Sequence, residues 1–299
     1  MQTIRTPAVA GQFYPADPAQ LHIQVRQFLS QVEPPDEPPP KAIIVPHAGY
    51  MYSGPVAASA YRNPIQVVEF IVARASCPWA KHGQDARATS TTGLGCLYAR
   101  MKAVRDRITR VVLLGPSHRV GFRGIAVSTM TAFATPLGQI PLDQEAVERV
   151  RPLPEVGFLE QAHAQEHSLE VHLPFLQEVL GNFRLMPLVV GDASPAEVGA
   201  VLEALWGGPE TLIVISSDLS HYHDYRTAQH LDNATSKAIE ALRFEDIGYD
   251  QACGRNPVNG LLWVARRKNL HGETIDLRNS GDTAGPRNQV VGYGAYVFH

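Results

Sequence analysis

The sequence has little cysteine and no long apolar run. Its three cysteines, Cys77, Cys96 and Cys253, are too few for a dense disulfide framework, and an odd number leaves at least one without an intramolecular partner. No apolar stretch approaches the roughly 18 residues needed to span a bilayer. The first residues, MQTIRTPAVAGQFYPAD, lack the apolar segment that a secretory signal needs. We therefore expect a cytoplasmic protein that does not enter a membrane.

The sequence also lacks a strong charge of either sign. The formal net charge is -3 at pH 7, and the chain has no run of lysine or arginine. Nucleic acids and anionic membrane surfaces are bound through clustered basic residues, so neither is an expected partner. The chain does have 299 residues, 44% of them apolar, which is enough to bury a large core. We expect a single domain over residues 1–299.

Three short apolar runs end in a histidine. Residues 111–118 read VVLLGPSH, residues 42–47 read AIIVPH, and residues 212–221 read LIVISSDLSH. Continuous aliphatic runs of this length, bounded by glycine, proline or serine, are typical of strands buried on both faces of a parallel sheet. The loops that leave parallel strands converge at one edge of the sheet. We therefore expect His47, His118 and His221 at one ligand-binding edge.

Helical patterns separate these runs. Asp17 is expected to cap a helix that begins at Pro18 and runs to about Val32. Further helices are predicted over 195–206, 225–243 and 257–268 and from Glu166 onward, and closing strands over 274–279 and 290–298. Residues 184–190, RLMPLVV, predict a strand near an edge or a bulge because a proline interrupts it. The pattern indicates an α/β fold, with a central mostly parallel or mixed sheet flanked by helices.

One stretch breaks this pattern. Residues 73–95 have neither helical nor strand periodicity and are rich in small polar residues. A structureless stretch beyond roughly 15 residues is unusual in a compact domain. We therefore predict an atypical inserted loop at about residues 63–101. Cys77, His82 and Cys96 lie there, but they lack the paired C-x-x-C or H-x-x-x-H spacing that a zinc site favours.

Imidazoles, a carboxylate and a thiol at strand ends favour a metal site. Neutral imidazole and thiolate bind zinc, iron and copper, and loops at strand ends bring together ligands that are distant in sequence. A hydrolase is the competing interpretation, with Ser216, Ser217 or Ser220 as nucleophile and His221 as base. No G-x-S-x-G elbow surrounds these serines. Spacing alone leaves both interpretations open.

Five motifs follow one another along the chain. They are PHAGYMYSG at 46–54, LLGPSH at 113–118, EHSLEVHLPF at 166–175, SSDLSHY at 216–222 and CGRNP at 253–257. Together they resemble the Memo family, whose prokaryotic members are known as AmmeMemoRadiSam system protein B. The resemblance runs from Arg5 to the C-terminus without the insertion. Members are similar to class III extradiol dioxygenases, with a central sheet between helical layers and a metal pocket at the strand ends.

The resemblance implies a metal site at His47, His118 and Cys253. It also implies that Asp218 and His221 lie beside the metal and that His172 lines the pocket. We expect these three to be the catalytic residues, with His172 or His221 moving protons. One transition metal is the expected cofactor, with iron first and copper or zinc as alternatives. If the three ligands share an ion at roughly 2.0 to 2.3 Å, their donor atoms must lie within about 5 Å of one another.

Two functions remain open from the sequence. The first is a metal-dependent redox protein or oxidoreductase that acts on an unknown small molecule. The second is a non-enzymatic adaptor that uses the histidine-lined cleft to bind a peptide or a protein, similar to the family's eukaryotic adaptor for phosphotyrosine segments. The resemblance also implies a radical-SAM protein as an associate. Efficient catechol ring cleavage is not expected, because the Cys253 thiolate is an oxidisable ligand.

Overall fold

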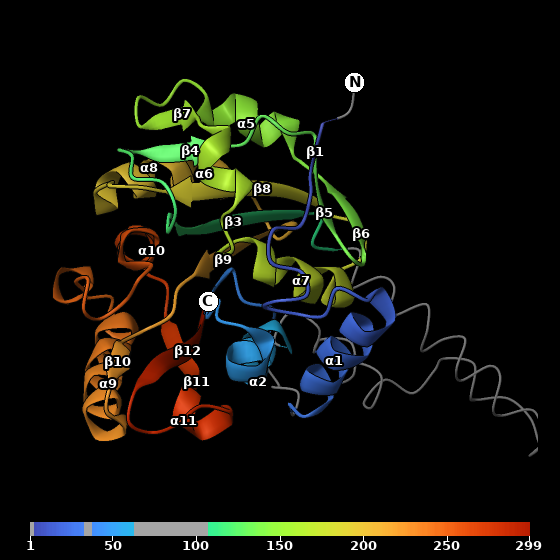
Figure 1. Cartoon of the computed structure of the whole chain (residues 1–299). Coiled ribbons are helices and arrows are strands. Elements are labelled where there is room, and N and C mark those ends of the chain that lie inside the picture. The colour runs from blue at the N-terminus through green and yellow to red at the C-terminus, as the bar shows by residue number, and fades with distance from the viewer. Residues whose placement is uncertain (1–2, 33–37, 63–106) are drawn as a thin grey trace, which may run out of the picture.

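A mixed β-sheet lies between two layers of helices (Figure 1). The computed structural model describes residues 3–32, 38–62 and 107–299. The predicted insertion, with Cys77 and Cys96, lies outside the described residues. Within them the main sheet has the strand order β10-β12-β2-β9-β3-β8-β4-β7, and β11 pairs with β12. The α/β fold class expected from the sequence is confirmed.

Four parallel strands form the centre of this sheet, namely β2 (Ala42–Val45), β9 (Thr211–Ser216), β3 (Arg110–Pro116) and β8 (Arg184–Val190). Beside β2 are the antiparallel β12 (Val290–Phe298) and its partners β11 (Gly272–Asn279) and β10 (His221–His223). Beside β8 are β4 (Ile125–Val127) and β7 (Val156–Phe158). A second sheet joins β1 (Ile4–Arg5), β5 (Ala132–Thr135) and β6 (Gly138–Pro141).

The central strands are buried on both faces, as their aliphatic runs predicted. Ile43, Val111 and Val214 pack in a core with α1 (Pro18–Ser30), α2 (Tyr50–Arg62) and α7 (Leu173–Val179). Their neighbours in sequence pack in a second core with α5 (Gln144–Val150), α8 (Pro195–Leu205), α9 (Tyr225–Glu240) and α10 (Arg255–Lys268). Successive strand side chains point to opposite faces, so each strand contributes to two cores.

The prediction for β8 is wrong, because this strand is interior to the sheet. It lies between β3 and β4. Pro187 is in register with Leu113 of β3, whereas β4 pairs only with residues 188–190. The proline therefore lies just before the ladder with β4 begins, where its missing N–H removes no bond to that strand.

The helix expected from Glu166 onward begins later. A single 3-10 turn covers Glu170–His172, and α7 begins at Leu173. Glu166 lies in the preceding turn, where its carboxylate accepts the N–H groups of His167 and Ser168. The remaining short elements are α6 (Glu160–Ala164), η4 (Phe244–Asp246) and α11 (Ser280–Thr283). In the part of the chain that is described, none of the helices combines the length and apolarity that crossing a membrane requires.

Candidate metal centre

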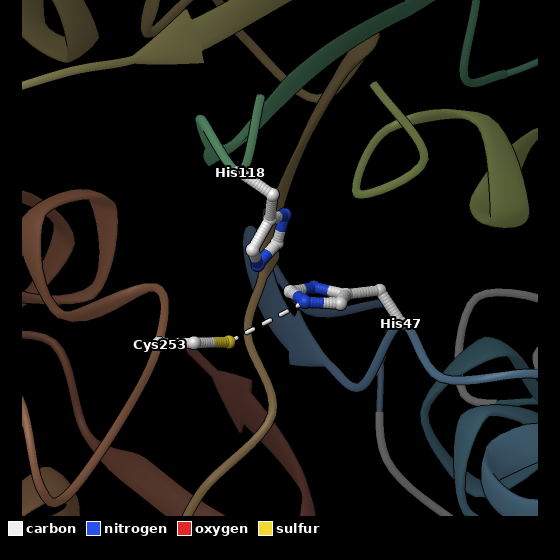
Figure 2. A group of neighbouring side chains, drawn as sticks. All are labelled: His47, His118 and Cys253. Atoms are coloured by element: carbon white, nitrogen blue, oxygen red, sulfur yellow. Dashed lines mark hydrogen bonds between the residues drawn. The ribbon is translucent and has the colours of Figure 1, made fainter. Parts of the chain in front are cut away.

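Three side chains from separate segments meet at the carboxyl edge of the central strands. His47 follows β2, His118 follows β3, and Cys253 precedes α10. Figure 2 shows the two imidazoles and the thiol directed toward one another. Because β2, β3 and β9 are parallel, the loops that leave them open on the same edge.

The donor atoms of these three residues lie close together. Their ligand atoms are all within 4.8 Å of one another. Cys253 Sγ lies 3.4 Å from His47 Nε2, the contact drawn in Figure 2. Two donors on one tetrahedral ion are about 3.5 Å apart. The group therefore meets the distance that the sequence analysis required and can hold a metal ion after small side-chain movements.

A buried hydroxyl orients His47. Ser216 Oγ lies 2.6 Å from His47 Nδ1 and 2.6 Å from the carbonyl oxygen of Ser168. The single hydroxyl proton goes to the carbonyl, which has no proton of its own, so His47 Nδ1–H must donate to Ser216. That tautomer leaves a lone pair on Nε2, the atom that faces Cys253. His47 is therefore held in the form that binds a metal.

A buried carboxylate orients His118 in the same way. Glu166 Oε1 lies 2.9 Å from His118 Nδ1, and Glu166 Oε2 accepts the backbone N–H of His118 at 2.6 Å. Burial opposes ionisation of Glu166, but its hydrogen bonds with His118 and with the backbone N–H of Ser168 lower its pKa to about 2. The ionised carboxylate can only accept, so Nδ1–H of His118 donates to it. Nε2 of His118 is left free for a metal, an arrangement common among zinc-binding histidines.

The protonation states of the ligands also suit a metal. Burial, followed by the charges of neighbouring histidines, lowers the pKa of His47 far below its usual value, which keeps the imidazole neutral. Burial and the adjacent Asp218 raise the pKa of the Cys253 thiol. A metal bound here would replace the thiol proton, because thiols bind metals as thiolates. The donor set of two imidazoles and one cysteine therefore fits a transition metal.

Asp218 and His221 lie beside these ligands, on the segment that follows β9. The Asp218 carboxylate accepts the backbone N–H of His47 at 2.7 Å, and burial raises its pKa to about 6. Asp218 thus fixes the backbone that carries His47. His221 Nδ1–H donates to the carbonyl oxygen of Leu219 at 2.8 Å, so in the neutral imidazole Nε2 is the free acceptor. His221 is only partly buried.

His172 lies behind His47. Its side chain is 1% exposed, and its Nε2 lies 2.9 Å from Ser216 Oγ. Since Ser216 gives its proton to Ser168, it accepts from both His172 and His47. His172 therefore acts on the ligand group through Ser216, and its catalytic role stays a prediction.

The geometry does not favour the hydrolase interpretation. Ser216, Ser217 and Ser220 are all buried. The hydroxyl of Ser216 donates to Ser168, and that of Ser217 donates to the carbonyl oxygen of Asp218. A nucleophile needs an adjacent base and access to substrate. These serines are shielded from solvent, and none of them hydrogen-bonds to His221.

Three residues were not predicted from the sequence to belong to the metal centre. Ser216 and Glu166 fix the two imidazoles, and His167 stacks on His118 with ring centroids 4.6 Å apart. Ligand atoms of His118, Glu166 and His167 also lie within 4.8 Å of one another. The motif EHS at 166–168 was the available signal, because it places an acid and a histidine side by side.

Two glycines allow the segments to approach so closely. A Cβ on Gly254 would lie 2.5 Å from the carbonyl oxygen of Ser216, and a Cβ on Gly115 would lie 2.8 Å from Ser168 Oγ. The first contact brings the Cys253 segment against the end of β9. The second brings the turn with Glu166 against the end of β3. Any larger residue would have to move one of these segments away from the site.

Known protein sequences place the chain in one family. The model of the Memo family, described as Memo-like protein, matches residues 5–72 and 87–297, and it omits 73–86 inside the predicted insertion. A MEMO1 family protein of Aquifex aeolicus is 33% identical over 99% of both chains, and one of Sulfolobus acidocaldarius is 30% identical over 97% of both. A crystal structure of an uncharacterized Escherichia coli K12 protein aligns with a TM-score of 0.40 and 16% identity, over 64% of this chain and 86% of that one.

Proposed function

The chain belongs to the Memo-like family, and we propose that it binds one transition-metal ion at His47, His118 and Cys253 for a redox or oxidoreductase role. One observation supports the proposal most. Two independent buried acceptors, Ser216 and Glu166, turn the Nε2 lone pairs of the two histidines toward the thiol. Metal-ligating histidines almost always donate their other ring N–H to such an acceptor, so both pairs suit metal ligands.

Iron is the first candidate for the ion, with copper and zinc as alternatives. A thiolate and two imidazoles form a softer ligand set than the two histidines and one carboxylate of a common iron(II) site. Copper and zinc are therefore more favoured here than at such an iron site. When bound, a transition metal supplies a Lewis-acidic and, for iron or copper, a redox-active centre. The substrate would be a small molecule or a peptide that reaches His118, the exposed member of the set. A radical-SAM protein is the proposed associate.

The surrounding side chains would hold the centre and move a proton. Asp218 fixes the backbone of His47, and Ser216, which also contacts His172, fixes its ring. His221 is partly buried and has a free Nε2, so we assign it the role of accepting or delivering a proton at that atom.

The test is elemental analysis of protein purified without oxygen. We expect about one transition-metal ion per chain in the wild type and a large loss in Cys253→Ser and His118→Gln. His230→Gln is the matched control, because His230 is an exposed residue of α9. Folded, metal-free wild-type protein that cannot be loaded with iron, copper or zinc would reject the proposal. It would favour the alternative of a non-enzymatic module that binds a peptide or a protein.

A further inference from the structure

A separate polar cavity of about 500 Å³ opens between α8 and α10. Its lining includes Asp192 and Ser194, which follow β8, and Arg255 and Asn259 of α10. None of the metal-ligand residues lines it. We propose that this cavity binds a small zwitterion of the amino-acid type, with an apolar side chain.

The carboxylate end of such a ligand is matched by Arg255. The guanidinium carbon lies 3.4 Å from the centroid of the Tyr249 ring, so the group is held flat against that ring. Its buried Nε has no hydrogen-bond partner among the described residues. A stacked guanidinium presents its edge N–H groups in the fork that pairs with a planar carboxylate. Arg123 adds a second positive charge to the lining.

The start of α10 favours an anion at the same end. Arg255 is the first residue of this 14-residue helix, and the N-cap Gly254 provides no side-chain hydrogen bond. The positive end of the helix dipole attracts negative charge at this point. The start of α8 differs, because Ser194 and Glu197 already satisfy each other's N–H groups in a capping box.

The ammonium end is matched by Asn259. This side chain lines the cavity and is only 6% exposed. Its Nδ2 donates to the carbonyl oxygen of Ile247 at 3.0 Å, which fixes the orientation of the amide. Its Oδ1 has no partner among the described residues. A buried acceptor without a donor is costly, so a ligand that brings an N–H group here would be favoured.

The charges around the cavity favour a zwitterion over a simple anion. Two arginines, Arg123 and Arg255, lie with three acids, Asp192, Glu197 and Glu245. Arg266 pairs with Glu245, which leaves two positive and two negative charges. A phosphate or a dicarboxylate would face uncompensated carboxylates, whereas an amino acid offers one charge of each sign.

Apolar residues complete the lining. Ala193, Pro195, Phe244 and Ile247 form an apolar part of the wall. They would take up an aliphatic or aromatic side chain, because burying apolar surface there is favourable.

The test is calorimetric titration of the full chain with L-leucine, L-methionine and L-phenylalanine. We expect at least one of them to bind with a Kd below about 1 mM. The leucine analogues 4-methylpentanoate, which lacks the amine, and 3-methylbutylamine, which lacks the carboxylate, should bind at least about tenfold more weakly than leucine. Equal binding of 4-methylpentanoate and leucine would identify an anion site and overturn the proposal. So would the absence of binding by all three amino acids.

Variants assign the two ends of the ligand. Arg255→Gln should weaken amino-acid binding at least about tenfold, and Asn259→Leu should weaken binding of the amino acid but not that of 4-methylpentanoate. Arg226→Gln removes the same charge from the exposed surface of α9 and serves as the control. If Asn259→Leu fails to fold, Arg255→Gln still decides the question, because unchanged binding in that variant would contradict the assignment.

Discussion

Replacing Ser216 with alanine should loosen the metal centre and the core behind it at the same time. The hydroxyl accepts Nδ1–H of His47 and Nε2–H of His172 and donates to the carbonyl oxygen of Ser168. Ser216 and both histidines are at most 2% exposed, so water cannot take its place. Ser216→Ala therefore leaves two buried donors and one buried acceptor without partners.

The size of the effect follows from those losses. Each buried donor without an acceptor costs about 1–3 kcal/mol, so the unfolding free energy should fall by roughly 2–5 kcal/mol after partial relaxation. The His47 ring also loses the bond that fixes its tautomer. Loss of such a partner typically weakens metal binding about 10- to 100-fold.

Two assays separate these effects. Urea unfolding of the metal-free protein measures stability, and competition with a chelator measures zinc affinity. Ser236→Ala is the matched control, because it removes a buried hydroxyl that contacts Thr274, away from the metal centre. The control should lose about 1 kcal/mol and keep its metal affinity. If Ser216→Ala loses stability but binds zinc within about twofold of the wild type, Ser216 does not orient the ligand.

Three further predictions concern the buried ion pair of Arg5, a buried histidine and catalysis. Arg5→Met should lower the urea-unfolding free energy by about 3–5 kcal/mol, because it leaves Glu170 buried without its cation; a loss below about 1 kcal/mol would refute this. Burial lowers the pKa of His163 to about 4, although the charges of Glu160 and Glu166 act to raise it. Below about pH 6.5, His163 is therefore protonated in the unfolded chain but still neutral in the folded one. The free energy of unfolding should therefore fall as the pH is lowered. Between pH 7 and pH 5, His163→Gln should lose about 2 kcal/mol less of it than the wild type does in urea unfolding. Equal losses in the two proteins would contradict this. Iron(II)-loaded protein should open the ring of protocatechuate at less than about 1 per second, because the ligand set includes an oxidisable thiol. The absorbance of the ring-opened product, recorded in the presence of oxygen, measures this rate. Faster turnover would make dioxygenase the leading function.

The strands and their terminal histidines were predictable from the sequence because they depend on local pattern. A continuous aliphatic run predicts a buried strand even when the strands that pair with it are unknown. The strands Thr211–Ser216 and Val290–Phe298 lie where this pattern predicted them. Once the strands are parallel, their ends share an edge, which brings His47 and His118 together.

The residues that orient the ligands were not predictable in this way. Ser216 lies 169 positions from His47, and Glu166 lies 48 positions from His118. No local sequence pattern shows such pairings. Glu166 was expected in a helix, but it lies in a turn, where its carboxylate accepts the N–H groups of His118, His167 and Ser168. The resemblance placed His172 in the lining of the pocket, and its contact with Ser216, the hydroxyl that orients His47, could not be predicted from the sequence.

X-ray absorption at the zinc edge of the zinc-loaded chain identifies the atoms that bind the ion. If His47, His118 and Cys253 are the ligands, we expect one sulfur at about 2.3 Å and at least two nitrogen ligands at about 2.0–2.1 Å. The sulfur contribution should disappear in Cys253→Ser, while His230→Gln should give the wild-type spectrum. A first shell without sulfur in the wild type, or a sulfur that persists in Cys253→Ser, would contradict the assignment of His47, His118 and Cys253 as the ligands.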